Sequence, residues 1–576
     1  MIPRIWKFRR SILIMQTVIL SALAVSIPQA VHATPSLGLD GVGTNNCQGQ
    51  FCVHSQLLTT TMGDDVIIVV LECGDGNPCK VSGVIDNSGL TFVQRISYRN
   101  SDLVGNTLWE YYAITTSPLN SDNITVAAPG CCEGMQVVAI HGANTRAVFD
   151  TNPSTPATCS GTACGNCYAD WNTNPGTCSA YIQTSGLDFV IASTQINDAP
   201  PCGGYSYSPA GYTPPPGFTN ITNQNNRFEV DYTITTTQQS NVVFNCNGTD
   251  ASAIVVDAIS SSEHSPILIN GNDAFTSDNG VTGGTGSSND PYLISGWTIQ
   301  SQDFGIEVAN TTAFFTITHV TVSCGIPGQP TCLEGIVLSS IQNGAVQNSH
   351  ISVQGIGVRV ENSGNFQLTS NDVRSGGVDE CGGAPACERW GAIFLNMSSS
   401  FDISNNSLEG GLGAINGFNL SDSSIVGNTG GGEDGITLHY LSGFLVSQNS
   451  IRAHIPIGVS SCGDLTIENN ALDSPNAGIM VSNCNNVLVS NNTANVSGGE
   501  EGIWVTGSDS INVTANTLSH NTNGIRLSNF ATGNTITGNL ISNNQCGIQT
   551  DSTSTINQNH VADNTFAGNT QDYCSL

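Results

Sequence analysis

Short apolar runs alternate with polar turns along the whole chain, and the spacing of these runs becomes regular after about residue 260. Upstream, β-rich runs of five to nine residues are separated by turn clusters, and none shows a convincing helical period. Such spacing is typical of an antiparallel β-sandwich, which we expect over residues 34–259. The expected strands are 64–72, 91–99, 107–115, 123–128, 135–142, 188–194, 229–236, 241–245 and 253–259.

A repeat begins beyond a short expected linker at 260–266. A glycine precedes a short apolar strand in segments such as "DGITL", "AGIMV" and "EGIWV", and most of these glycines are 20 to 24 residues apart. They are Gly305, Gly335, Gly357, Gly391, Gly413, Gly435, Gly458, Gly478, Gly502, Gly524 and Gly547. A series of asparagines runs in phase with them: Asn348, Asn371, Asn406, Asn428, Asn449, Asn470, Asn492, Asn516, Asn539 and Asn559.

A repeat of about 22 residues is too short for a strand–helix–strand unit, but it suits one coil of three short strands and three turns. Stacked coils pair each strand with its copies about 4.8 Å away and bury their apolar residues against each other. Asparagine tolerates left-handed backbone at tight turns, and stacked amides can hydrogen-bond between coils. The repeat therefore predicts a parallel β-helix of about eleven coils over residues 267–576.

The cysteines offer a test of this register. All 20 lie after the N-terminal segment, an even number that favours disulfides in an exported chain. Cys462 and Cys484 are 22 residues apart, so neighbouring coils would bring them within disulfide distance. We also expect Cys546–Cys574 to fasten the last coil, and two further bridges to close insertions in the repeat. These two are Cys324–Cys332 and Cys381–Cys387.

The segment "PILINGNDAFTSDNGVTGGTGSSNDPYLISGWTIQSQDFG" (266–305) and the Gly-Ile coils resemble the right-handed β-helix repeats of the pectin-lyase-like superfamily. They look most similar to the branch named after the nitrous-oxide reductase maturation protein NosD. The resemblance implies a right-handed helix but little about activity, since this fold carries lyases, hydrolases, epimerases and adhesins. The Gly-His-Gly motif of polygalacturonases and the Arg-x-Pro-x-x-Arg motif of pectate lyases are absent, and the repeat contains no lysine.

The first 33 residues read as an export signal. A basic start is followed by an apolar run from Ser11 to about Ile27 and a small-residue site at Val31–Ala33. Arg9 and Arg10 leave both the general and the twin-arginine export route open. No later stretch is long and apolar enough to span a bilayer. We therefore expect an extracellular or cell-surface protein without a stable membrane span.

The chain has a net charge of −30, although only 10% of its residues are charged. Lys80 is the single lysine after the signal, so the clustered basic residues that bind nucleic acid are missing. Asn-x-Ser/Thr sequons, among them Asn123, Asn247, Asn310, Asn396 and Asn512, would accept glycans in a host that glycosylates. We expect polysaccharide or a cell-surface glycan as the partner and no cofactor.

One column of side chains on the coils is a candidate binding face. The second residue after each glycine should point outward, which places Trp504 between Met480 and Arg526. An aromatic plane beside a guanidinium suits a sugar, and Glu500 and Glu501 could accept its hydroxyl protons. Alternatively, Trp504 packs under a loop or against the sandwich. The expected column is Glu307, Val337, Arg359, Ile393, Thr437, Ser460, Met480, Trp504, Arg526 and Gln549.

Acidic residues also gather just before the glycines, along one edge of this column. Glu388 and Asp434 would lie two coils apart, at the upper edge of the separation for an inverting glycosidase pair. His439 could serve as an acid or base beside them. Turn acids that merely face solvent are the simpler explanation.

Three functional hypotheses follow. The first is a non-catalytic, extracellular β-helix protein that binds or presents polysaccharide. The second is a polysaccharide hydrolase or lyase that uses Glu388, Asp434 and His439. The third is a NosD-like periplasmic metal-handling protein, although the histidines of the repeat are scattered and show no metal-ligand spacing, so we expect no metal site.

Overall fold

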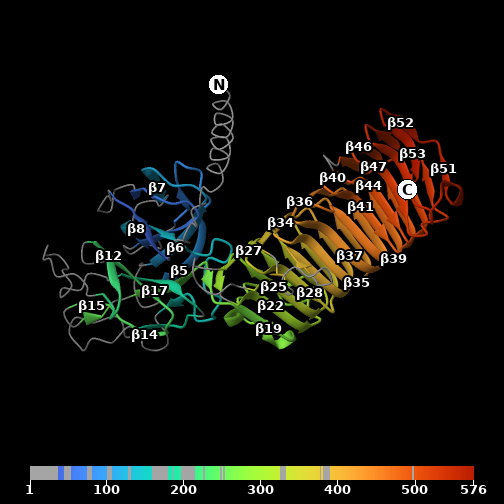
Figure 1. Cartoon of the computed structure of the whole chain (residues 1–576). Helices are drawn as coiled ribbons and strands as arrows, with labels where there is room; N and C mark the ends of the chain where they lie inside the picture. Colours follow the sequence, from blue (N-terminus) through green and yellow to red (C-terminus); the bar gives the residue numbers. More distant parts are fainter. Residues whose placement is uncertain are drawn as a thin grey trace, which may run out of the picture. The chain divides into compact units, whose positions relative to one another are not determined.

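The computed structural model describes residues 37–44, 54–73, 81–99, 107–126, 132–158, 179–184, 186–195, 214–224, 228–246, 249–250, 253–301, 303–324, 333–376, 378–379, 389–495 and 499–575. Within these ranges the chain is almost entirely β-structure (Figure 1). The expected signal peptide, the Cys-bearing stretch 159–178 and most of the Pro/Gly-rich stretch 199–216 lie outside the described residues.

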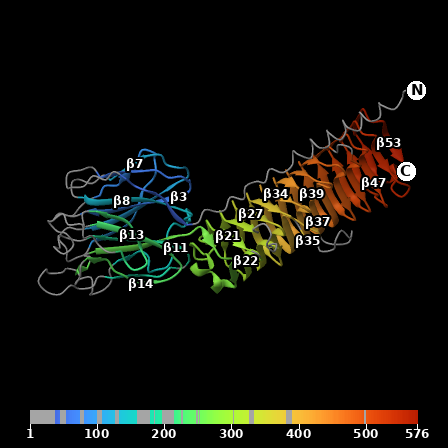
Figure 2. The same ribbon diagram turned by 60° about the vertical axis from the view of Figure 1, so that its left-hand side comes forward.

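Two five-stranded antiparallel sheets form the N-terminal sandwich (Figure 2). All nine expected strands are present, with ends that shift by a few residues. The first sheet is β1 (Gly38–Val42), β8 (Cys132–His141), β3 (Asp65–Cys73), β6 (Thr107–Thr115) and β5 (Val93–Arg99). The second is β12 (Thr219–Gln224), β13 (Phe228–Thr235), β11 (Asp188–Gln195), β17 (Ala253–Ser260) and β9 (Ala157–Thr158).

Alternation along the strands builds the sandwich core. Ile68 and Ile140 of the first sheet belong to one buried cluster with Phe189 and Val255 of the second, as the two-residue period of a strand requires. Smaller sheets flank this pair. They are β2 (Ser55–Leu58), β7 (Asp122–Val126) and β4 (Val84–Ile85); β10 (Ala180–Ile182) with β14 (Gln239–Val242); and β15 (Asn245–Cys246) with β16 (Thr249–Asp250).

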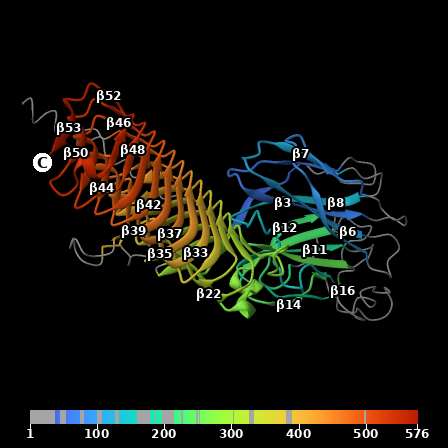
Figure 3. The same ribbon diagram turned by 90° about the vertical axis from the view of Figure 1, so that its right-hand side faces the viewer.

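The C-terminal domain is a right-handed parallel β-helix of about eleven coils (Figures 1 and 3). Each coil has three strands, and each strand pairs in parallel with its copy in the next coil. In four coils the first and second strands run on as one long strand: β33 (Ile393–Ser404), β35 (Gly413–Val426), β37 (Asp434–Ser447) and β39 (Ile457–Glu468). The other first strands are β19 (Ile267–Asn270), β22 (Phe304–Thr311), β25 (Glu334–Ile341), β28 (Ile356–Glu361), β41 (Ala477–Ser482), β44 (Glu501–Thr506), β47 (Asn523–Ser528), β50 (Cys546–Thr550) and β53 (Gln571–Ser575). The other second strands are β20 (Tyr292–Ser295), β23 (Phe315–Thr318), β26 (Gly344–Gln347), β29 (Gly364–Thr369), β42 (Asn485–Ser490), β45 (Asp509–Thr514), β48 (Thr535–Thr537) and β51 (His560–Ala562).

The third strands form a separate parallel sheet. They are β18 (Glu263–His264), β21 (Thr298–Ser301), β24 (Thr321–Cys324), β27 (His350–Val353), β30 (Asp372–Ser375), β34 (Ser407–Gly410), β36 (Thr429–Gly431), β38 (Ser450–Arg452), β40 (Ala471–Asp473), β43 (Thr493–Asn495), β46 (Thr517–Ser519), β49 (Leu540–Ser542) and β52 (Thr565–Ala567). The remaining elements are the hairpin β31 (Val378–Asp379) and β32 (Arg389–Trp390) and the 3-10 turns η3 (Asn272–Ala274), η4 (Ser277–Asn279) and η5 (Ile556–Gln558).

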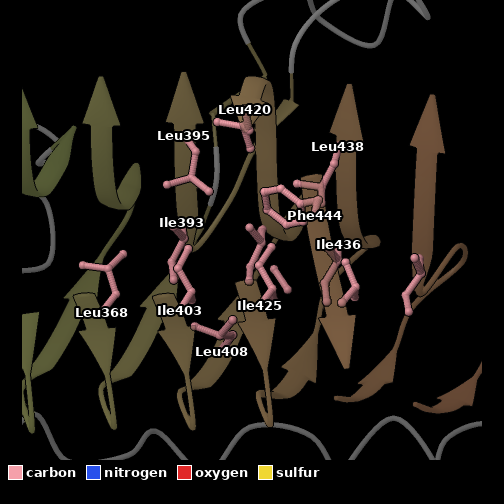
Figure 4. Close-up of a cluster of buried hydrophobic side chains, with 14 of the residues drawn as sticks. Leu368, Ile393, Leu395, Ile403, Leu408, Leu420, Ile425, Ile436, Leu438 and Phe444 are labelled. Atoms are coloured by element: carbon pink, nitrogen blue, oxygen red, sulfur yellow. The ribbon is translucent and has the colours of Figure 1, made fainter. Parts of the chain in front are cut away.

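One continuous apolar core fills the β-helix, and stacked aliphatic residues build it coil by coil (Figure 4). Ile436 of one coil pairs with Ile415 and Ile457 of its neighbours, and all three are fully buried. The repeat glycines allow this close stacking. A Cβ on Gly478 would lie 2.6 Å from the Gly502 carbonyl oxygen of the next coil, which is closer than real contacts permit.

The asparagine ladder exists and links the coils through its amides as expected, but the left-handed backbone lies elsewhere. Asn449 donates its backbone N–H and its Nδ2 to Oδ1 of Asn470, at 2.9 and 3.0 Å, and all the neighbouring rungs repeat this pattern. The left-handed residue is the one before the rung, such as Gln448 with φ 58°. The rung itself uses its buried amide to link coils. The rungs are Asn371, Asn406, Asn428, Asn449, Asn470, Asn492, Asn516, Asn539 and Asn564.

Two members of the predicted ladder were therefore wrong. Ser349 and not Asn348 precedes Asn371 in the ladder, since the Ser349 N–H donates to Asn371 Oδ1. Asn559 accepts from Asn534 in a second, separate ladder. Sequence spacing alone could not separate these cases, because each alternative is only one to five residues from the true rung.

The described disulfides confirm the coil register. Cys462 and Cys484 are bonded across adjacent coils with their Cα atoms 4.5 Å apart, and Cys546 is bonded to Cys574. The predicted bridges at Cys324–Cys332 and Cys381–Cys387 lie outside the part of the chain whose side chains are described.

Candidate functional site

The first strands of the coils present two outward columns of side chains, which we call the front face. Strand pairing gives the first column as Glu307, Val337, Arg359, Phe394, Asn416, Thr437, Gly458, Met480, Trp504, Arg526 and Gln549. The second contains Glu361, Asn396, Phe418, His439, Ser460, Ser482, Thr506 and Ser528.

Two residues of the predicted column were misplaced. Ile393 pairs with the inward Val358, so Phe394 takes the outward position in the strand, although it is itself only 3% exposed. Ser460 lies in the second column, because Gly458 itself pairs with Thr437 and occupies the outward position of its coil. Both errors arise where the glycine does not directly precede the inward aliphatic residue: Gly391 lies two residues before Ile393, and Gly458 follows Ile457.

Trp504 faces outward, as expected, and is half-buried. Its indole N–H donates to Ser528 Oγ at 2.9 Å, and the Arg526 guanidinium lies over its ring at 5.1 Å from the centroid. Met480 precedes it in the column, one coil away. The ring is thus held in place on the front face, with one of its two faces already covered by Arg526.

Arg526 also forms an ion pair. Its Nη1 donates to Glu501 Oε1 at 2.7 Å, and Glu501 is only 1% exposed, whereas neighbouring Glu500 is exposed. A carboxylate removed from water requires a charged partner. Glu501 therefore meets Arg526 and not solvent, and Glu500 is the acid available at this edge.

The same arrangement occurs near the other end of the helix. Arg359 donates from Nη1 to Glu334 at 2.5 Å and from Nη2 to Glu361 at 2.8 Å. Burial opposes the charged guanidinium, but the hydrogen bonds to Glu334 and Glu361 outweigh it and raise the pKa of Arg359 above its ordinary value.

Aromatic rings gather in the middle of the front face. Phe394 lies 6.2 Å from Phe418, and Phe418 stacks on the His439 ring at 5.0 Å and 17°. His439 Nδ1 is 2.5 Å from Ser460 Oγ on the next coil. This part of the face therefore combines an aromatic stack with a hydroxyl at its end, a combination that sequence reasoning missed apart from His439.

Gly458 leaves a gap in the front column beyond this stack. A Cβ there would meet Ile455 Cγ2 at 3.5 Å and Thr437 Oγ1 at 3.9 Å, which are ordinary contacts, so packing does not require glycine. The outward side chains of Thr437 and Met480 are two coils apart, or about 10 Å at 4.8 Å per coil. The gap is the one place in the described column where a repeat position carries no side chain.

The candidate catalytic residues are not brought together. Glu388 lies outside the described residues. Asp434 and His439 are five residues apart on β37, which is about 16 Å at 3.3 Å per residue. General acid–base chemistry needs both groups within hydrogen-bond reach of one reacting site. These two side chains therefore do not form an acid–base pair.

The four arginines of the β-helix whose side chains are described have carboxylate partners. Besides Arg359 and Arg526, Arg374 lies 3.3 Å from Asp372, and Arg452 lies 3.4 Å from Asp473. Together with the net charge of −30, this pairing leaves the described surface of the helix unsuited to attract anions.

Residues 412–574 match the family model of NosD, the periplasmic copper-binding protein. The matched residues make up less than half of the chain, and all of them lie within the parallel β-helix. Among curated proteins, none matches the chain significantly. The described part of the chain contains no helix long and apolar enough to cross a membrane.

Solved structures resemble this chain at the level of the fold. The Dettilon tailspike protein (gp208) is 14% identical, with a TM-score of 0.37 over 48% of this chain and 62% of that one. The A-module of the mannuronan C-5 epimerase AlgE4 from Azotobacter vinelandii is 14% identical, with a TM-score of 0.32 over 51% and 87%. The Streptococcus pneumoniae surface adhesin PfbA is 10% identical, with a TM-score of 0.30 over 49% and 82%.

Copper is the metal implied by the name of the matching family, but the residues of the matching segment do not fit it. Cys462, Cys484, Cys546 and Cys574 are all in disulfides and offer no thiolate. His439 already contacts Ser460 through Nδ1. Among the described residues, no group of three or more His, Cys, Asp or Glu side chains could hold a metal ion.

Proposed function

We propose that this protein is a non-catalytic, extracellular or cell-surface protein whose β-helix binds neutral polysaccharide on its front face. The observation that carries the proposal is the gap at Gly458. It lies between the His439 stack and the Met480–Trp504–Arg526 group, with Ser460 and Ser482 beside it. Thr437 and Met480 flank the gap in its own column, and the His439 ring lies in the adjacent column. A hydroxyl, a thioether and one ring around an open floor suit one sugar ring, which packs its C–H face and hydrogen-bonds its hydroxyls.

Charge favours a neutral ligand over an acidic one. An acidic glycan needs unpaired cations, whereas the four arginines of the helix whose side chains are described are paired with carboxylates. The net charge of −30 would also repel a polyanion. The two disulfides of the helix support an oxidising location outside the cytoplasm.

Gly458→Phe tests the proposal by filling the gap. The variant should fold, because the added Cβ makes only ordinary contacts, and it should lose binding to neutral oligosaccharides measured by calorimetry. Trp504→Ala should weaken the same binding by about 1–3 kcal/mol, as for other lost aromatic stacking contacts. Thr466→Phe adds the same ring to the same strand β39 on its second arm, away from the front face, and serves as the control.

Wild-type binding by Gly458→Phe would exclude the front face as the glycan site. Loss of thermal stability in Trp504→Ala, with no specific effect on binding, would assign Trp504 to packing. Detection of released reducing ends after incubation with neutral polysaccharides would contradict the non-catalytic part of the proposal.

A further inference from the structure

The turn between the first and second strands of each coil forms a second surface, which we call the corner groove. Two left-handed residues, three positions apart, shape each turn. The first rim consists of Asn362, Met397, Asn419, Tyr440, Ser461 and Asn483, and the second of Asn365, Ser400, Asp422, Gly443, Asp464 and Asn486. Between the rims runs a floor of small residues that pair from coil to coil: Gly364, Ser399, Ser421, Ser442 and Gly463.

Met397 and Tyr440 are unusual residues for the left-handed positions of the first rim. Left-handed backbone is sterically unfavourable for residues with a large side chain, and asparagine and glycine are the usual choices. Yet Met397 has φ 47° and Tyr440 has φ 59°. Their side chains are 54% and 60% exposed, so burial does not offset this strain. Strained positions of this kind gather at ligand-binding sites.

The groove beside Met397 has a volume of about 400 Å³ and an uncharged lining. Its walls include Gln342, Asn362, Asn365, Ser399 and Ser400. Amides and hydroxyls both donate and accept hydrogen bonds, as the hydroxyl groups of a sugar do. An apolar side chain at the rim then supplies the contact for the C–H face of the sugar ring.

Spacing along the rim suggests how a chain would lie. Met397 and Tyr440 are separated by Asn419, so they are two coils, or about 10 Å, apart. This is close to the length of one disaccharide unit in an extended chain. The second rim is acidic at Asp422, in the coil between Met397 and Tyr440, and again at Asp464, which disfavours an anionic ligand.

We infer that the corner groove binds an extended, neutral polysaccharide chain that runs along the helix axis, with Met397 and Tyr440 contacting alternate sugar units. The ligand class is that of the proposed function, on which this inference rests, but the residues are separate from the front face. A protein with both surfaces holds its ligand at two places on the same coils.

The test is calorimetric titration of the full-length protein with cellohexaose, xylohexaose and mannohexaose, and with hexagalacturonate as the acidic comparison. The double variant Met397→Asn/Tyr440→Asn places asparagine, the commonest residue of the first rim, at both positions. It should bind neutral hexasaccharide at least tenfold more weakly while its melting temperature stays equal or rises, because strain is relieved. Phe530→Asn removes another exposed left-handed aromatic (φ 64°), four coils beyond Tyr440, and should relieve strain without weakening binding.

The outcomes separate this inference from the proposed function. If the double variant binds as the wild type does while Gly458→Phe abolishes binding, the corner groove is not a site and the front face remains. If Gly458→Phe binds as the wild type does while the double variant loses binding, the front face is excluded and the corner groove is supported. If none of the three neutral hexasaccharides binds the wild-type protein, or if hexagalacturonate binds as tightly, the inference is overturned.

Discussion

Glu501 and Arg526 join adjacent coils through an ion pair of 2.7 Å, and they lie 25 residues apart in the sequence. Glu334 and Arg359 have the same separation and the same contact. In both cases an acid directly before a repeat glycine meets an arginine two residues after the next one. The acids of this edge thus include structural links between coils, which differ from the solvent-facing acids that the sequence suggested.

Arg526→Met should destabilise the protein because it leaves the Glu501 carboxylate buried without its partner. Breaking a buried pair in this way costs about 3 kcal/mol, and the 27% exposure of Arg526 places the effect at the lower end. Chemical denaturation measures the change. The double variant Glu501→Gln/Arg526→Met should recover most of the loss, because no buried charge remains.

Arg452→Met is the matched control, since Arg452 and Asp473 are 85% and 56% exposed. Exposed pairs contribute less than about 1 kcal/mol. An equal loss of stability in Arg452→Met and Arg526→Met would show that burial of Glu501 is not the cause.

Asn449→Ala should destabilise the β-helix by about 2–3 kcal/mol. The substitution removes the amide that accepts from Asn428 and donates to Asn470, and it leaves buried polar groups unsatisfied. Gln448→Gly, one residue earlier, should have no cost or should stabilise slightly, since Gln448 is left-handed and exposed. Comparable losses in the two variants would contradict the distinction between rung and left-handed residue.

Peptide mapping without reduction should recover Cys462 linked to Cys484 and Cys546 linked to Cys574. Replacement of Cys462 and Cys484 by alanine should lower the free energy of unfolding by about 3 kcal/mol, as expected for a cross-link spanning 22 residues. A free thiol at either position in the purified, unreduced protein would refute the coil register.

The sandwich should lose stability as pH rises. Burial, with the neighbouring Asp231, raises the pKa of Glu229 to about 9, and burial with Asp150 raises that of Asp188 to about 8. A raised carboxyl pKa contributes stability that is present below about pH 4, the ordinary carboxyl value, and is lost as pH rises through the folded values. Melting curves from pH 4 to 9 measure this slope.

Glu229→Gln should flatten the pH dependence, because a neutral amide cannot acquire the buried charge. Asn220, which donates to Glu229 and Asp231, would remain in place. A melting temperature that rises from pH 6 to 9 in the wild-type protein would be opposite in sign to this expectation.

Much of the fold follows from the sequence because periodicity is a direct consequence of geometry. The repeat of glycine and Ile, Val or Leu predicts the inward stack, and the 22-residue separation of Cys462 and Cys484 predicts their bond. The predicted register was wrong at Ile393 and Ser460, where the repeat glycine does not directly precede the inward residue. There, pairing with the neighbouring coil decides which residue points inward, and a single sequence does not encode that choice locally.

The candidate site was less predictable. The outward position of Trp504 follows from strand alternation, but the cover that Arg526 provides and the burial of Glu501 depend on side-chain conformations. The signal for the gap at Gly458 was present, since this glycine follows the inward Ile457 where others precede it. Nothing in the composition marks Met397 and Tyr440, because their strain exists only in the folded backbone.

The asparagine ladders and left-handed turns also limit where insertions can be accepted during evolution. Two corners of each coil are fixed by left-handed residues and by amides that bond to the next coil. An extra residue at either corner would displace a rung and break its bonds to both neighbours. Between β25 and β49 the one long insertion lies between the third strand of one coil and the first of the next, from β30 to β33, whereas the end coils also carry insertions between first and second strands, from β19 to β20 and from β50 to β51. New loops, and any new activity they bring, therefore have one corner open to them in the middle coils and a second corner at the two ends of the helix.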